Sequence, residues 1–133
     1  MSASGRWPVL QRDEEFADYL REAAPTPAGM FWRFIAMARS CGAVTFELQR
    51  SFVVLRGSKR IFASVEVRPD GLRGHLNLAH QLPTGGRIRK AEPLTKKVYF
   101  HSFVVSSPGD LDEEFAQLMR EARDVGDGHF PRE

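Results

Sequence analysis

The sequence predicts a single α+β domain, in which about three helices cover one face of a mainly antiparallel, five-stranded meander sheet. Three observations support this prediction. Two amphipathic segments precede residue 43, the apolar period then changes to two as far as residue 80, and a further amphipathic segment follows residue 110. Because only one sheet face is apolar, we expect the other face to be polar and basic.

Two helices are expected before the sheet. Residues 13–24 carry their apolar side chains on one stripe and acidic residues in the first turn. In the second helix Thr26 is expected to be the N-cap, Pro27 takes the first helical position, and Gly42 ends the helix. Apolar residues surround most of this second helix, which indicates deep burial.

Four strands are predicted next, in a region where β-branched and aromatic residues dominate. They are Val44–Leu48, Phe52–Arg56, Arg60–Arg68 and Leu72–Ala79. Strict alternation in the third strand places Phe62 on the polar face, where its ring is a candidate to stack on a nucleic-acid base.

The third and fourth strands are expected to form a hairpin around Asp70-Gly71, a strong two-residue turn signal. This loop places Glu66 opposite His75 and Ser64 opposite Asn77, and it gathers the apolar residues of both strands on the other face. A three-residue loop would flip one strand and expose half of the apolar set. The polar face is then expected to carry a cluster of Ser64, Glu66, Arg68, His75 and Asn77.

Residues 81–97 are expected to form a long basic loop, followed by a fifth strand at Val98–Val105. The last helix is expected to start at Asp110, with Glu113 completing a capping box, and to end at Gly126. The predicted domain therefore covers residues 1–126, and residues 127–133 are expected to be a loose tail.

Composition indicates one soluble globular domain, since 42% of the 133 residues are apolar and 27% are charged. Cys41 is the single cysteine, so no internal disulfide is possible, which suits a reducing compartment. No apolar run approaches the length of a membrane span, and residues 1–11 lack a signal-peptide pattern. We therefore expect a cytoplasmic protein that does not contact membranes.

Positive charge is concentrated in residues 50–98. This block holds eleven Lys and Arg against three Asp and Glu, whereas the preceding segment is net negative by one and the following segment by five. The formal net charge of +2 therefore hides a strong asymmetry. A field of this kind steers an anionic partner toward one face.

The stretch from Phe46 to Ala122 resembles a bacterial family known only as a domain of unknown function (number 5655). The similarity lies in the strand pair around RSFVVLRGSKRIFASVEV, the strand LRGHLNL, a basic loop, and a strand that runs into SSPGDLDEEFAQLMREA. Family members stand alone or behind nuclease-like domains, so the resemblance implies an accessory role near nucleic acid. It implies no catalytic residues.

Two groups of residues are candidates for a functional site. A Glu66–His75 pair is the arrangement that prepares a general base, but ordinary cross-strand pairing on a solvated face explains it as well. Glycines at 85 and 86 beside basic residues suit a phosphate cradle, yet a solvated basic loop is the alternative, because no Walker or dinucleotide pattern is present. The candidate anion-binding residues are Arg73, Arg87, Arg89, Lys90, Lys96 and Lys97.

No cofactor or metal is expected. The spacing of His75, His80 and His101 matches no structural zinc pattern, and a partly buried, hydrogen-bonded role is the expectation for His101. The sequence thus favours a binding module for an anionic partner such as nucleic acid. The alternatives are a protein-interaction module or homo-oligomer that uses the open sheet face or a free edge, and last a small enzyme that uses Glu66 and His75.

Overall fold

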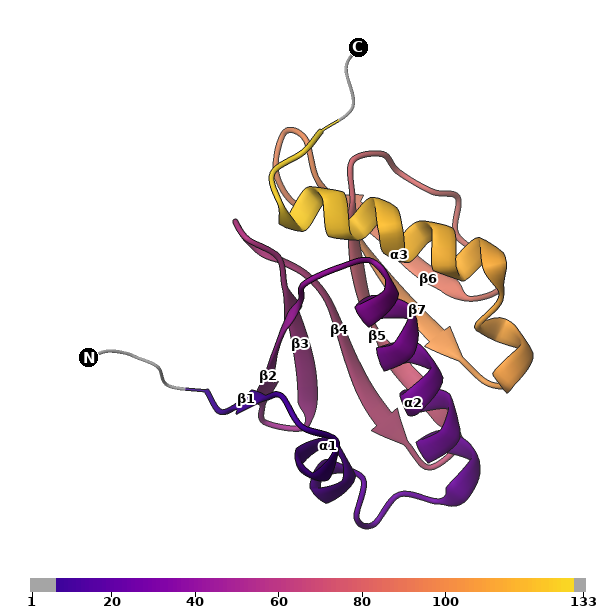
Figure 1. The fold of residues 1–133 in the computed structure, drawn as a ribbon. Helices are drawn as coiled ribbons and strands as arrows, with labels where there is room; N and C mark the ends of the chain where they lie inside the picture. Colours follow the sequence, from indigo (N-terminus) through magenta and orange to yellow (C-terminus); the bar gives the residue numbers. More distant parts are fainter. Residues whose placement is uncertain (1–6, 131–133) are drawn as a thin grey trace.

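A computed structural model of the chain describes residues 7–130 and confirms the α+β class. Helices α2 (Pro25–Ser40) and α3 (Glu113–Gly126) pack on one face of the sheet, and the short α1 (Asp13–Tyr19) lies beside α2 (Figure 1). The strands are β1 (Val9–Leu10), β2 (Thr45–Gln49), β3 (Phe52–Arg56), β4 (Ile61–Arg68), β5 (Gly71–Leu78), β6 (Ile88–Pro93) and β7 (Tyr99–Val105). All neighbouring strands are antiparallel, in the order β1-β2-β3-β4-β5-β7-β6.

The sheet has seven strands, so the prediction of five is wrong. β1 contributes only two residues beside β2, and β6 lies inside the segment that was expected to be a loop. β6 pairs with β7 on one side only, and Ile88 is its one buried residue. A strand at the border of a sheet buries little, so its sequence lacks the apolar pattern by which strands are recognised.

The helices meet the sheet through an aromatic core. Phe34 of α2, Phe103 of β7 and Phe115 of α3 are fully buried, and their ring centroids lie 5.2–6.1 Å apart. Aromatic rings at these separations gain packing energy beyond their burial. The last helix is therefore docked on the sheet through its apolar stripe, as its sequence predicts.

The helix ends differ from the predicted ones. α2 begins at Pro25 after an N-cap at Ala24, two residues before the position expected from Thr26. α3 is capped by Asp112, whose Oδ1 accepts a hydrogen bond from the Phe115 N–H at 3.0 Å, and not by Asp110. Asp110 instead closes a short 3-10 turn, Pro108–Asp110. No helix among residues 7–130 has the length and apolar character needed to cross a membrane.

The β4–β5 hairpin has the predicted faces but not the predicted register. Its two-residue loop is Pro69-Asp70, so Arg68 pairs with Gly71 and every partner is shifted by two residues. A Cβ at position 71 would lie 2.0 Å from the Val105 carbonyl oxygen, so this paired position accepts only glycine. A shift of two keeps each side chain on its face.

Phe62 lies on the helix side of the sheet, contrary to the prediction. The β3–β4 register shifts between Leu55 and Arg56, and Phe62 is the extra residue of this bulge. Its fully buried ring packs against Gly126 at the end of α3, where a Cβ would come within 2.6 Å of the ring. Phe62 therefore cannot stack on a ligand at the open face.

Candidate binding site on the open sheet face

The sheet face opposite the helices is hollowed by a groove of about 690 Å³. This volume lies in the range of ligand-binding clefts. Most of the groove wall is apolar, so the centre of the open face is not the polar and basic surface that the sequence predicts. Its central side chains are Phe52, Val54, Ile61, His75 and Phe100.

His75 occupies the middle of the groove on β5. Its Nδ1 lies 2.6 Å from the Oγ of Ser64, the opposite residue on β4, and its ring stacks on Phe100 of β7 with centroids 4.9 Å apart. Burial lowers the pKa of His75 to about 4, so the imidazole is neutral at neutral pH. Within residues 7–130 the Ser64 contact is the only hydrogen bond of this ring, which leaves Nε2 available to a ligand.

Ser64 and His75 form a hydroxyl–imidazole pair of the kind that activates a nucleophile. Catalysis by this pair is disfavoured by three features. The lowered pKa makes His75 a weak base, no carboxylate in the described chain orients its ring, and the Ser64 side chain is buried. The pair is better suited to a fixed, neutral hydrogen-bonding surface than to proton transfer.

Asn77 follows His75 on the same face of β5, opposite Phe100. Its Nδ2 donates a hydrogen bond to the Ile61 carbonyl oxygen at 3.2 Å, which fixes the orientation of the amide. Oδ1 has no hydrogen-bond partner among residues 7–130, although the residue is only 5% exposed. A buried acceptor without a partner is rare, and it calls for a donor from outside the described chain.

A second hollow of about 430 Å³ continues from the groove to one end of the sheet, and Ile61 and His75 line both. Two turns converge there, the β3–β4 turn (57–60) and the β6–β7 turn (94–98). We call the exposed cations of these turns the basic end. The basic end consists of Lys59, Arg60, Lys96 and Lys97.

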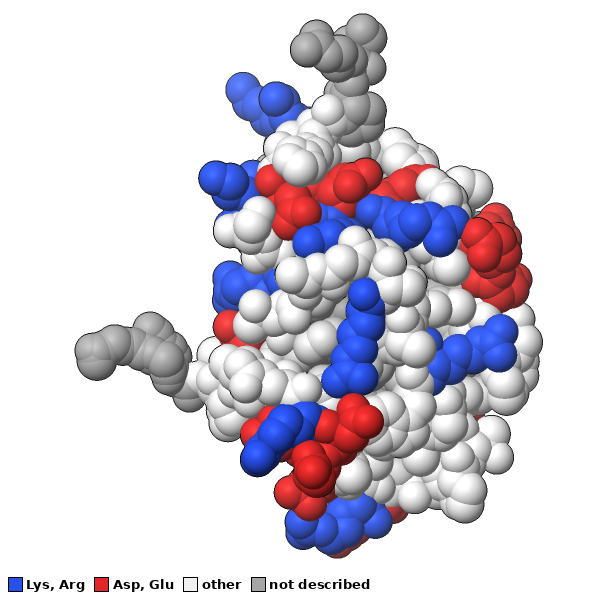
Figure 2. All heavy atoms as spheres, in the orientation of Figure 1, with Lys and Arg blue, Asp and Glu red and all other residues white. Residues whose placement is uncertain are grey.

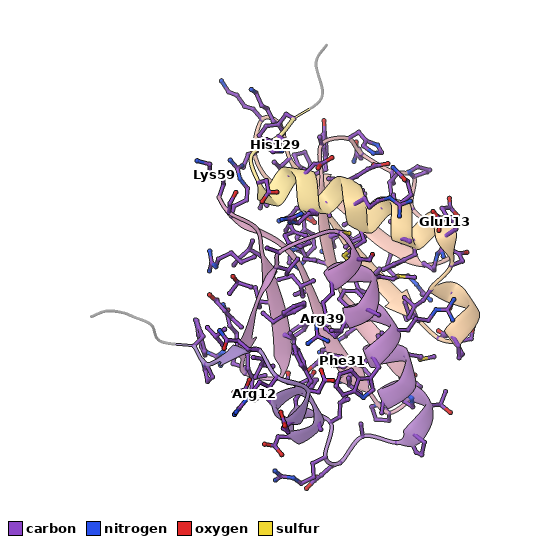
Figure 3. All side chains as sticks on the ribbon, in the orientation of Figure 1. Arg12, Phe31, Arg39, Lys59, Glu113 and His129 are labelled. Atoms are coloured by element: carbon purple, nitrogen blue, oxygen red, sulfur yellow. The ribbon has the colours of Figure 1, made fainter. Side chains whose placement is uncertain are left out.

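The two turns of the basic end are held together by the residues that follow α3. Arg60 lies over the Phe130 ring at 5.3 Å and Lys97 over the same ring at 5.5 Å. Lys59 approaches Gly128, beside the position labelled His129 in Figure 3. Figure 2 shows the blue side chains projecting at this end of the molecule, whereas blue and red alternate over the rest of the helix-covered face. No acidic residue lines the second hollow.

Residues 127–130 therefore contact the β3–β4 turn, although the sequence predicts a loose tail from residue 127. The Asp127 carboxylate accepts hydrogen bonds from the backbone N–H and the hydroxyl of Ser58, at 2.9 and 3.1 Å. Residues 131–133 of the predicted tail lie outside the described residues.

Glu66 pairs with Arg73 and not with His75, so the predicted general-base pair is absent. The Arg73 Nε donates to Glu66 at 2.6 Å, Arg68 lies 3.8 Å away, and Ser51 donates a short hydrogen bond. Burial acts to raise the pKa of Glu66, but these hydrogen bonds and charges outweigh it and hold the pKa below its ordinary value. Arg68 and Arg73 therefore already have an anionic partner within the sheet face.

Arg87 is a structural residue. Its guanidinium contacts Asp112 and Glu114 at 2.8 Å each and lies over the Phe115 ring. The hydrogen bond to Asp112 raises the pKa of Arg87 further. Arg87 thus ties the segment before β6 to the start of α3, and it has no free charge to offer.

The glycine-containing segment before β6 forms a tight turn. The Gly85 N–H donates to the Ile88 carbonyl at 2.7 Å, and both Gly85 and Gly86 have positive φ. Lys90 pairs with Glu92 at 3.5 Å. Arg89 is exposed at the opposite end of β6 from the 94–98 turn, so the structure does not bring it to the basic end.

His80 and His101 have ordinary partners. His101 is fully buried, accepts a hydrogen bond from the Leu82 N–H at 3.0 Å, and contacts the Tyr99 carbonyl at 3.1 Å. His80 pairs with Glu121 at 2.9 Å. Residues 7–130 contain no group of three or more His, Cys, Asp or Glu arranged to hold a metal ion.

Sequence reasoning missed Phe52 and Phe100 in the groove and Lys59 and Arg60 at the basic end. The alternation of β3, with Val53 and Leu55 on the helix side, places Phe52 on the open face and is the signal that identifies it. The two turns are separated in sequence by residues 61–93, so their convergence has no such signal.

Comparisons with models of protein families, with curated proteins and with solved structures found no match to this chain.

Proposed function

We propose that this chain is a binding module for an anionic partner, and that the partner is nucleic acid held through its phosphate backbone with little or no base specificity. One observation carries the proposal. The basic end gathers four exposed cations on two turns that border one hollow; Lys59 and Arg60 line this hollow, and its lining includes no carboxylate. Phosphate groups relieve the repulsion between such cations and release their own counterions on binding.

The proposal revises which residues make the contact. Lys96 and Lys97 keep the role that the sequence suggests for them, and Lys59 and Arg60 join them. Arg73, Arg87 and Lys90 each have a carboxylate partner within the protein, and Arg89 lies away from the basic end. A cation that is already paired must lose that partner before it can contact phosphate, so its net contribution is small.

The test is the salt dependence of binding to a labelled 12-nucleotide oligonucleotide, followed by fluorescence anisotropy from about 50 mM salt upward. The variant Lys96→Gln/Lys97→Gln should bind more weakly, and the slope of log K against log salt should fall by about 0.7 to 0.9 for each lost phosphate contact. A second double variant, Lys59→Gln/Arg60→Gln, should behave in the same way.

The matched control is Arg89→Gln/Lys90→Gln, which removes the same charge from the same hairpin but away from the basic end. Its affinity and salt slope should remain near those of the unmodified protein. Absence of binding at 50 mM salt would overturn the proposal and favour a protein partner on the open face. An equal loss in the control would show that only overall charge matters.

A further inference from the structure

Three features of the open face remain without a role, and they lie where the groove, lined by Phe100, meets the second hollow, lined by Asn77. The Asn77 Oδ1 is a buried acceptor without a partner, the His75 Nε2 is free, and the stacked rings of His75 and Phe100 border the groove. His75 and Asn77 are two residues apart on β5, so their side chains emerge on the same face about 6.6 to 7 Å from each other.

The chemistry of these groups defines the ligand. Stacked aromatic rings are extended favourably by another planar ring, whatever its identity. An acceptor that is fixed in place by its own amide hydrogen bond requires an N–H or O–H donor. His75 is neutral at neutral pH, so this part of the groove suits an uncharged group.

Because the second hollow lies beside the basic end, the part of the ligand that reaches it should be negatively charged. Ile61 and His75 line both the groove and the hollow at the basic end, so one ligand can reach both regions. The uncharged planar part lies in the groove, and an anionic part lies toward Lys59, Arg60, Lys96 and Lys97. A nucleotide combines a planar ring that carries N–H groups with a phosphate, and it satisfies every one of these requirements.

We propose that the base of one nucleotide unit lies where the groove meets the second hollow, where it extends the Phe100–His75 stack and donates an N–H to the Asn77 Oδ1, while its phosphate contacts the basic end. This inference rests on the proposed function, and it adds that the bound nucleic acid must be single-stranded at this position. A duplex keeps its bases stacked on one another and their edges paired, so it cannot deliver a base to the groove. The ligand is therefore single-stranded nucleic acid or a free nucleotide.

The test compares three probes at one salt concentration: a mixed-sequence 12-nucleotide single strand, the corresponding 12-base-pair duplex, and AMP. The single strand should bind at least about tenfold more tightly than the duplex, as expected from one base stack. If AMP binds as tightly as the single strand, the ligand is a free nucleotide. If AMP binds more weakly, the ligand is a single-stranded nucleic acid. Equal binding of single strand and duplex would overturn the inference.

Two variants address the groove itself. Phe100→Leu removes the stacking ring and Asn77→Leu removes the acceptor, and each should weaken single-strand binding by about fivefold or more. The salt slope should stay unchanged in both, because no phosphate contact is lost. Tyr99→Leu, a change of the neighbouring aromatic residue on the other face of β7, is the matched control and should bind normally.

The outcomes separate the two proposals. If Lys96→Gln/Lys97→Gln weakens binding but Phe100→Leu and Asn77→Leu do not, the basic end binds a backbone and the groove inference is wrong. If Phe100→Leu abolishes binding while Lys96→Gln/Lys97→Gln does not change it, the groove binds the ligand, and the proposal that the basic end contacts phosphate is wrong. Circular dichroism and thermal unfolding of each variant separate these losses from misfolding.

Discussion

Acidification should destabilise this protein before its carboxylates begin to protonate, because of His75. Burial of the imidazole disfavours its charged form and places its pKa at about 4 in the folded state, below the ordinary value of 6.5. The unfolded chain therefore binds a proton that the folded protein does not bind. The stabilising contribution is complete above pH 6.5 and is lost as the pH falls toward 4.

The size of the effect follows from the difference in pKa. Each pKa unit corresponds to about 1.4 kcal/mol, so the free energy of unfolding should fall by about 2 to 3 kcal/mol between about pH 8 and pH 4.5 because of His75 alone. His101 adds to the loss in the same direction, because burial also lowers its pKa. Glu15, Glu66, Asp112 and Asp127 have lowered pKa values, so their contributions are lost mainly as the pH falls further, through these lowered values.

Urea unfolding at these two pH values measures the effect, with the variant His75→Gln as the comparison. Gln cannot titrate, and its amide can still hydrogen-bond to the Ser64 hydroxyl. The unmodified protein should lose about 2 to 3 kcal/mol more than the variant does over this interval. An equal loss in both proteins would refute the reasoning, and it would mean that a protonated His75 is tolerated in the groove.

Two further predictions concern stability at neutral pH. Phe115→Ala should lower the free energy of unfolding by about 3 to 5 kcal/mol in urea titrations, because the ring is fully buried against Phe34 and Phe103; an unchanged midpoint would show that α3 is not docked through this ring. Gly74→Ala should prevent stable folding, as judged by near-ultraviolet circular dichroism, because its Cβ would lie 1.9 Å from the Ser64 carbonyl oxygen. The control Gly29→Ala, in α2 with nothing within 4 Å of the added Cβ, should instead be neutral or stabilise by up to about 1 kcal/mol.

Alternation along the strands was enough to predict which face most side chains occupy, but not which residues are opposite one another. A slip of two residues leaves Ser64, Glu66, His75 and Asn77 on the same face, so the hydrophobic pattern cannot detect it. In the observed register Gly71 is a paired residue, and it lies so close to the Val105 carbonyl, a group distant in sequence, that a Cβ would come within 2.0 Å of the oxygen. These four polar residues therefore share one face of the sheet, while their cross-strand partners differ from the predicted ones.

The candidate site was harder to predict because a charge count does not show which charges are neutralised. Arg87 lies in one of the most basic stretches of the sequence. Its charge is nevertheless neutralised by Asp112 and Glu114, which lie 25 and 27 residues further along the chain. Lys96 and Lys97 have the same local character but lie in a turn that borders a hollow without carboxylates in its lining. Only the folded arrangement distinguishes these cases.

The border strands of the sheet have a consequence for the behaviour of the protein at high concentration. Open sheet borders are templates on which further strands assemble, and amyloid grows in this way. Here β1 offers two residues, and β6 ends at Pro93, which has no N–H to donate. The Ile88 and Ala91 carbonyls of β6 already accept hydrogen bonds from the Gly85 N–H and the Gln81 side chain. The two borders of the described sheet therefore offer few free backbone groups on which a strand of another molecule could assemble.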